Sequence, residues 1–241
     1  MTDNPRSEFN SHQTILSCLH SVSPSRSQEL DDLIQELSVQ FHLDVNAYRV
    51  NDFWAEFPSR KINIPRLCLF RLKAHAYSYL VVLNNILARR EHRVVENLCQ
   101  REHLVNELLT WATRTDVATT DQDGSEFSIG AVPNDLEDML NNAAICKESG
   151  PAEEGFRHAV AWMIHHELAH IRLGHDDVVD PDIVAQEREA DCTAIDWLLS
   201  DHTKEAELLA SVYGITVGLG WLACLRVYLD EEDEQHESRT C

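Results

Sequence analysis

The spacing of apolar residues predicts that the first half of the chain is mainly helical. From Ser27, apolar residues recur one helical turn apart as far as Phe41, behind a serine that suits a helix N-cap. A longer helical stretch is expected from about Pro65 to Trp111, and a break near Arg90 could divide it. We find no candidate chemistry in this half.

The second half alternates between short turn signals and further periodic segments. Alternation of apolar with small or polar residues predicts a short strand over 127–132. Helices are expected near Asp135–Cys146, from about Ala152 to Leu173, and from about Ile183 to Leu199. Gly174 is expected to stop the second of these helices.

The predicted fold class is therefore α+β and predominantly helical. Residues 1–25 are rich in Ser, Asn and Pro and are interpreted as a flexible lead-in. Residues 26–115 would form an N-terminal helical layer, and residues 120–230 a core that carries the chemistry. The acidic tail, 231–241, is expected to fray in solvent.

Length and composition agree with one folded domain, alone or with a helical extension. The 241 residues are 44% hydrophobic and 25% charged, with only 8 Gly and 7 Pro, which excludes collagen-like or largely disordered chains. The formal net charge is −21, and almost all of it lies in residues 121–241, with 7 basic and 27 acidic side chains. Such a surface repels phosphate backbones, so we expect no nucleic acid ligand, and it weakly favours a basic partner.

Cysteine usage and the N-terminus both favour the cytoplasm. The seven cysteines are odd in number and include no CxxC pair, so neither a disulfide framework nor a thiolate metal site is indicated. The first residues, MTDNPRSEFNSHQ, lack the basic-then-apolar pattern of a secretory signal.

The segment AVAWMIHHELAHIRLGH contains an HExxH motif at His166, Glu167 and His170. On a helix the two histidines share one face, so their imidazoles can bind one zinc ion, while Glu167 reaches the attacking water as general base. The alternative is a pair of hydrogen-bonded histidines on a half-exposed face. The apolar spacing around the motif favours the metal site, because a charged glutamate on a largely buried helix is costly without a role.

A third ligand is expected on the next helix, in the segment QEREADCTAIDWLL. Glu187 and Asp191 are four residues apart and share a face, whereas Glu189 points about 160° away from it. Glu187 can complete a His2Glu zinc site, and Asp191 can hydrogen-bond a ligand imidazole. Alone, these carboxylates would be interpreted as a solvated acidic face; seventeen residues after an HExxH motif, a ligand is favoured.

These two motifs resemble those of the gluzincin metallopeptidases, and HELAHIRLGH with EREADCTAIDWLL looks most like the Lit peptidase family of bacterial phage-exclusion proteins. The resemblance implies a zincin-like core, with an HExxH helix, a second ligand-bearing helix and a short edge-strand sheet. It also implies His166, His170 and Glu187 as zinc ligands, Glu167 as general base and Asp191 as their support.

The resemblance further implies an intracellular endopeptidase that stays latent until phage infection. Its target would be a translation factor, elongation factor Tu in the founding case, and a phage peptide would activate it. The strand at 127–132 would pair with an extended substrate. ImmA/IrrE-type regulatory peptidases, which cleave repressors, share the same motif logic and stay an alternative. Two further alternatives are a metal-independent acidic binding module and a structural or inactive zinc site.

Four other residues near the motifs invite a role. His175 and Tyr213 are candidates to stabilise the oxyanion of the reaction. Cys192 is a conceivable fourth metal ligand, although its place on the helix disfavours it. His165 is expected to be a packing or surface residue.

An uncharged stretch at residues 208–225 reaches the length of a membrane-spanning helix, with Gly214 and Gly218 spaced as GxxxG. Polar residues dilute it and an acidic segment follows it, so we favour a core helix whose glycines allow close approach of the motif helices. Peripheral association with the inner membrane stays open.

Overall fold

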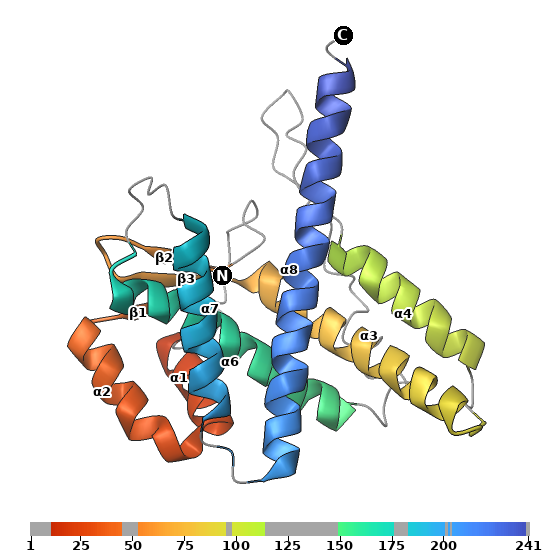
Figure 1. Cartoon of the computed structure of the whole chain (residues 1–241), viewed down its shortest axis with the longest axis horizontal. Helices are drawn as coiled ribbons and strands as arrows, with labels where there is room; N and C mark the ends of the chain where they lie inside the picture. The colour runs from red at the N-terminus through yellow and green to blue at the C-terminus, as the bar shows by residue number, and fades with distance from the viewer. Residues whose placement is uncertain are drawn as a thin grey trace, which may run out of the picture.

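The structure is a computed structural model that describes residues 11–44, 53–94, 98–113, 149–175, 183–200, 202 and 204–239. The described elements are mainly helices, with a small sheet at one side of the molecule (Figure 1). In chain order they are α1 (Ser11–Val22), the 3-10 helix η1 (Pro24–Arg26), α2 (Ser27–Leu37), β1 (Gln40–Asp44), β2 (Trp54–Glu56), β3 (Lys61–Pro65), α3 (Arg66–Arg90), α4 (Leu98–Thr113), α6 (Ser149–Leu173), α7 (Ile183–Leu199) and α8 (Glu205–Arg239).

The sheet has three strands in the order β1-β3-β2. The central strand β3 pairs in parallel with β1 and antiparallel with β2, so β2 forms one edge. Ile62 and Ile64 of β3 are fully buried and join the main hydrophobic core. The predominantly helical α+β class is therefore confirmed.

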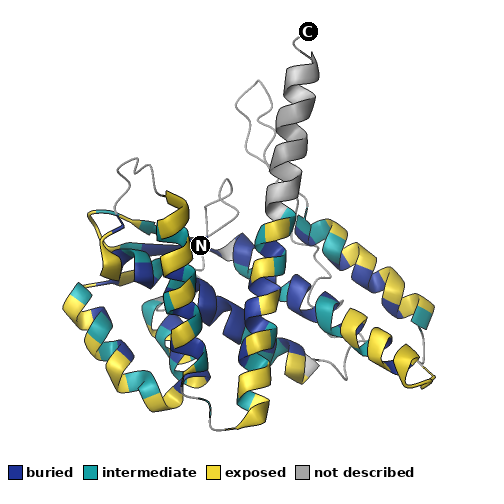
Figure 2. Cartoon of the chain, in the orientation of Figure 1, coloured by how far each residue is buried: buried dark blue, intermediate teal, exposed yellow. Residues whose placement is uncertain are grey.

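Helix α6 occupies the centre of the molecule and lies behind α7 and α8 in Figure 1. It packs against α1, α3, α7 and α8 and touches both β2 and β3. Its middle turns are almost fully buried, as Figure 2 shows, and Trp162 is 1% exposed. The sheet and helices α1, α3, α7 and α8 are therefore positioned by their packing against α6.

Most predicted helices lie where the apolar spacing placed them. Helix α2 begins at Ser27, and α6 and α7 end at Leu173 and Leu199 as expected. The first of these ends earlier than its apolar spacing indicated, at Leu37, because Phe41 belongs to β1, and Arg26 rather than a serine is its N-cap residue. Gly174, with φ +72°, ends α6 in the left-handed conformation that glycine adopts without strain. The long stretch from Pro65 divides after Arg90, which ends α3.

The expected flexible lead-in is wrong for residues 11–22, which form α1. Ile15, Leu19 and Val22 are spaced by four and three residues, so they share one helix face, and all three are buried in the main core. The polar residues between them obscured this short amphipathic pattern.

The purely helical N-terminal layer is also wrong, because residues 40–44, 54–56 and 61–65 form the strands of a sheet. The three strands have three to five residues each, too short to give a clear alternation in the sequence. The expected strand at 127–132 and the helix near Asp135–Cys146 lie outside the described residues.

The acidic segment was expected to fray in solvent, and in the structure residues 231–239 continue helix α8. Glutamate, the commonest residue after Asp230, is a good helix former, so the chain can extend the preceding helix.

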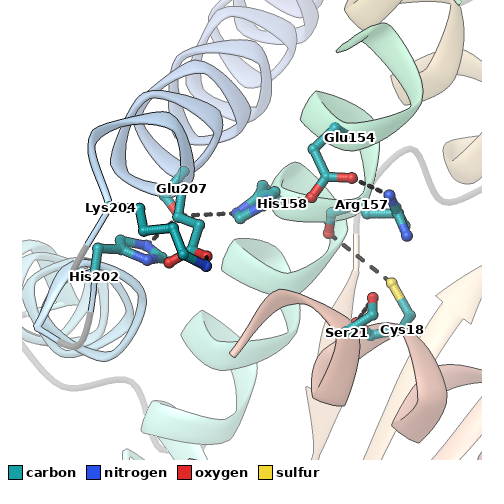
Figure 3. Close-up of polar contacts among 9 residues, drawn as sticks. Cys18, Ser21, Glu154, Arg157, His158, His202, Lys204 and Glu207 are labelled. Atoms are coloured by element: carbon teal, nitrogen blue, oxygen red, sulfur yellow. Dashed lines mark hydrogen bonds and ion pairs between the residues drawn. The ribbon is translucent and has the colours of Figure 1, made fainter. Parts of the chain in front are cut away.

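A cluster of polar side chains joins α6 to α8 and the loop before it (Figure 3). The buried Ser211 hydroxyl lies 2.8 Å from His158 Nδ1 and 2.6 Å from His202 Nε2, so it can donate to one imidazole and accept from the other. Glu154 forms an ion pair with Arg157 and lies 3.3 Å from His158 Nε2. Burial lowers the pKa of His158.

The contact between α6 and α8 depends on glycine. A Cβ on Gly214 would lie 2.7 Å from the backbone nitrogen of Ala159, and one on Gly218 would lie 2.6 Å from the Trp162 ring. The expectation that these glycines allow close approach of the motif helix is confirmed. By length and composition Glu205–Cys224 could cross a membrane, and 33% of its apolar window is buried in the protein.

We expect Gly214→Ala to lower the free energy of unfolding by about 1–3 kcal/mol, because the added methyl collides with α6 backbone that cannot move independently. Gly150→Ala is the matched control, since nothing lies within 4 Å of its Cβ position in α6. Urea denaturation of both variants checks this. Equal stability of the two variants would contradict the close-packing argument.

Acid should destabilise the fold through His75 of α3. Both ring nitrogens are buried without a hydrogen-bond partner, and burial, helped by the charge of Arg71, lowers the pKa of His75 to about 4. The unfolded chain binds this proton below about pH 6.5, so stability is lost as the pH falls from 6.5 towards 4.

The His75→Leu variant should lose less stability than the wild type over this interval, by roughly 3 kcal/mol, because it has no such proton to bind. Urea denaturation of both proteins at pH 7 and pH 4 gives the difference. Parallel losses in the two proteins would exclude His75 as a source of acid sensitivity.

Candidate active site

Two histidines of α6 face each other on one side of the helix. His166 and His170 are one turn apart, and their Nε2 atoms lie 3.0 Å from each other. Both side chains are mostly shielded, with 15% and 13% of their surface exposed. Both imidazoles therefore bring a ring nitrogen to the same point.

Helix α7 brings a carboxylate to that point. One oxygen of Glu187 lies 3.3 Å from His166 Nε2, and the other lies 3.7 Å from His170 Nε2. The three ligand atoms all lie within 4.8 Å of one another. The structure thus brings together the three residues that the sequence singled out as metal ligands.

The separations suit a small tetrahedral metal ion. Ligands about 2.0–2.1 Å from such an ion lie roughly 3.3 Å from one another, close to the spacings of His166, His170 and Glu187. Two imidazoles and one carboxylate also form the donor set of hydrolytic zinc sites, which leave a fourth position for water or substrate. A metal ion fits these residues.

Asp191 supports the first ligand from behind. Its Oδ1 lies 2.9 Å from His166 Nδ1, the ring nitrogen that faces away from Glu187. The expected supporting contact is therefore present in the described structure. A carboxylate here favours the tautomer whose Nε2 is free to bind a metal.

The electrostatics of the metal-free cluster separate the two histidines. Burial opposes protonation of His166, but hydrogen bonds to Asp191 and Glu187 outweigh it and raise the pKa of His166 to about 10. Burial, with the neighbouring His166 charge, lowers the pKa of His170 to about 4. One proton therefore occupies the place where the ligand nitrogens converge.

Glu167 lies beside the cluster and is held by the edge of the sheet. The backbone N–H of Ala55 in β2 donates to Glu167 Oε2 at 2.6 Å. Sequence reasoning assigned no chemistry to this part of the chain, and a backbone N–H has no side-chain signature that could have indicated it. The edge strand thus borders the candidate catalytic carboxylate.

His175 lies buried against His170, which argues against its expected role at the oxyanion. Its Nδ1 lies 3.1 Å from His170 Nδ1, and its Nε2 lies 3.3 Å from Glu189 Oε2. Both ring nitrogens are engaged and the residue is buried. Glu189, expected to point away from the ligand face, approaches the site through His175.

Tyr213 is remote from the site, so its expected role there is also wrong. Its ring covers Gly155, and its hydroxyl donates to the carbonyl of Ala76. Gly155 precedes His166 by eleven residues, which is about 16 Å along α6. Cys192 is exposed as a free thiol, and the described metal cluster does not include it.

His165 packs as expected and helps to fix α7 against α6. Its imidazole is 4% exposed and stacks on Trp197 with ring centroids 4.9 Å apart. The guanidinium of Arg26 covers the Trp197 ring at 3.7 Å and donates to the Trp197 carbonyl. Burial lowers the pKa of His165 to about 3, so it stays neutral.

Comparisons with known proteins place this chain in a family. The model of the family Peptidase U49 matches residues 74–239, a segment that contains both motifs. The chain is 34% identical over 123 residues to the cell death peptidase of Escherichia coli (strain K12). That match covers 51% of this chain and 39% of the relative. No solved structure matches.

The match to the family model covers more than half of the chain and agrees with the resemblance to Lit peptidases. It includes every residue of the candidate metal cluster and its Asp191 support. The chain therefore belongs to the Peptidase U49 family.

Proposed function

We propose that the protein is a zinc-dependent endopeptidase with His166, His170 and Glu187 as its zinc ligands. Family membership already indicates a peptidase. The single observation that carries the metal assignment is the convergence of two imidazole nitrogens and one carboxylate within 4.8 Å. The HExxH helix, the ligand-bearing helix α7 and the sheet edge together support a zincin-like core.

Within this proposal the chain's own residues divide the work. A bound zinc ion would polarise the scissile carbonyl and acidify the attacking water. Glu167 would accept a proton from that water and deliver it to the departing amine. Asp191 would hold the ring of His166, so that its Nε2 stays directed at the site.

An extended substrate would pair with a sheet edge beside Glu167. Strand β2 supplies such an edge in the described structure, because it has only β3 as a strand partner. The Ala55 N–H already donates to Glu167 there, so a peptide along this edge would lie next to the general base. The segment first expected to serve this purpose, 127–132, lies outside the described residues.

The biological setting follows from the resemblance to Lit peptidases and from the name of the cell death peptidase relative. We propose a latent cytoplasmic enzyme of phage defence that cleaves a translation factor, with elongation factor Tu as the first candidate and a phage peptide as the trigger. The match spans only 39% of that relative, so the relative's activity comes to this chain as a proposal.

The metal site predicts about one zinc ion per chain in purified protein, lost or strongly weakened in Glu187→Ala because two imidazoles alone bind zinc poorly. Asp196→Ala is the matched control, since it removes an exposed carboxylate from the same helix. Plasma mass spectrometry of dialysed protein gives the metal content. A folded wild type that takes up no zinc at neutral pH would sink the proposal.

Glu167→Gln should keep the zinc content of the wild type and lose proteolysis by at least about 100-fold, because an amide cannot accept the water proton. New protein N-termini can be counted by mass spectrometry in bacteria that produce either protein, with and without phage infection. We expect cleavage, including that of elongation factor Tu, in the wild type only. Undiminished cleavage by the variant would remove Glu167 from the mechanism.

A further inference from the structure

The geometry points to His175 and Glu189 as a positioning pair that orients the metal ligand His170. The pair reaches His170 on the ring nitrogen that faces away from Glu187. His175 Nδ1 lies 3.1 Å from His170 Nδ1, and Glu189 Oε2 lies 3.3 Å from His175 Nε2. This inference rests on the metal site proposed above and extends it beyond its three ligands.

The end of α6 explains how a residue five positions after His170 can reach it. Gly174 adopts φ +72°, which reverses the chain at the end of the helix. The backbone N–H of His175 then donates to the carbonyl of His170 at 3.0 Å. The turn therefore lays the His175 ring against the His170 ring, with centroids 5.1 Å apart.

The contacts among His170, His175 and Glu189 can all be hydrogen bonds if each imidazole adopts one particular tautomer. If His170 binds a metal through Nε2, its proton is on Nδ1 and can be donated to His175 Nδ1. His175 must then carry its own proton on Nε2, where Glu189 accepts it. Every donor then meets an acceptor.

The two histidine ligands are thus supported by different means. Asp191 contacts His166 directly at 2.9 Å, whereas Glu189 acts on His170 only through His175. The His175 side chain is 8% exposed, so its ring is fixed by packing, while the Glu189 side chain is 59% exposed. We therefore expect the imidazole to contribute most of the positioning and the carboxylate to refine it.

The test is zinc affinity of the full-length chain, measured by competition with a chromophoric chelator. His175→Leu keeps apolar bulk but removes the acceptor, and we expect zinc affinity to fall by about 10–100-fold. Glu189→Ala, at an exposed position, should lower it by a smaller factor. The control Asp196→Ala should bind zinc as the wild type does.

A conservative variant separates positioning from simple packing. In His175→Gln the side-chain amide oxygen can accept the proton of His170 Nδ1, so this variant should recover affinity relative to His175→Leu. Thermal unfolding of the metal-free proteins controls for stability. A purely structural role would lower the metal-free melting temperature in parallel with affinity, and the glutamine would then give no selective recovery.

The outcomes distinguish the two proposals. A wild type that binds no zinc overturns the metal site itself. Zinc binding by the wild type with unchanged affinity in both His175→Leu and Glu189→Ala overturns the positioning pair alone. Reduced affinity in both variants, with the metal-free melting temperature of Glu189→Ala unchanged, supports it.

Discussion

A helix that is buried on almost every side must still present two imidazoles to one point, where a carboxylate of α7 meets them, and the rest of the molecule is arranged around this requirement. Helix α6 contacts the sheet and four other helices, and the turns before His166 are close to fully buried. The ligand histidines escape this burial only on the side that meets α7. There, carboxylates replace apolar neighbours, so each imidazole exchanges lost water for a charged partner.

This arrangement requires that α6 be held rigidly by the elements that do no chemistry. Glycines on α8 let that helix approach within backbone contact, and the Ser211 cluster adds hydrogen bonds where the two helices meet. Arg26 stacks on the Trp197 ring and donates to the Trp197 carbonyl, and these contacts hold the C-terminal end of α7 in place. Ligand geometry depends on such distant packing, because a small shift of α7 would separate Glu187 from the histidines.

The candidate site was more predictable than the fold around it. Helix geometry puts His166 and His170 on one face and Glu187 and Asp191 on another, and the HExxH context indicated that the two faces would meet. His175 could not be placed, since its position depends on the backbone reversal at a glycine. The short strands and the contact of Ala55 with Glu167 arise from long-range pairing, which leaves little trace in the order of residues.

Strand β2 extends the folded unit beyond the segment that the family model matches. The segment shared with the family model starts at residue 74, yet Ala55 and the whole sheet lie before it. Residues of α1 and the strands also share one hydrophobic core with α6. A fragment cut at the edge of the family segment would therefore keep every proposed metal ligand but expose the face of α6 that this core covers. The segment that the family model matches is thus shorter than the segment that shares the main hydrophobic core.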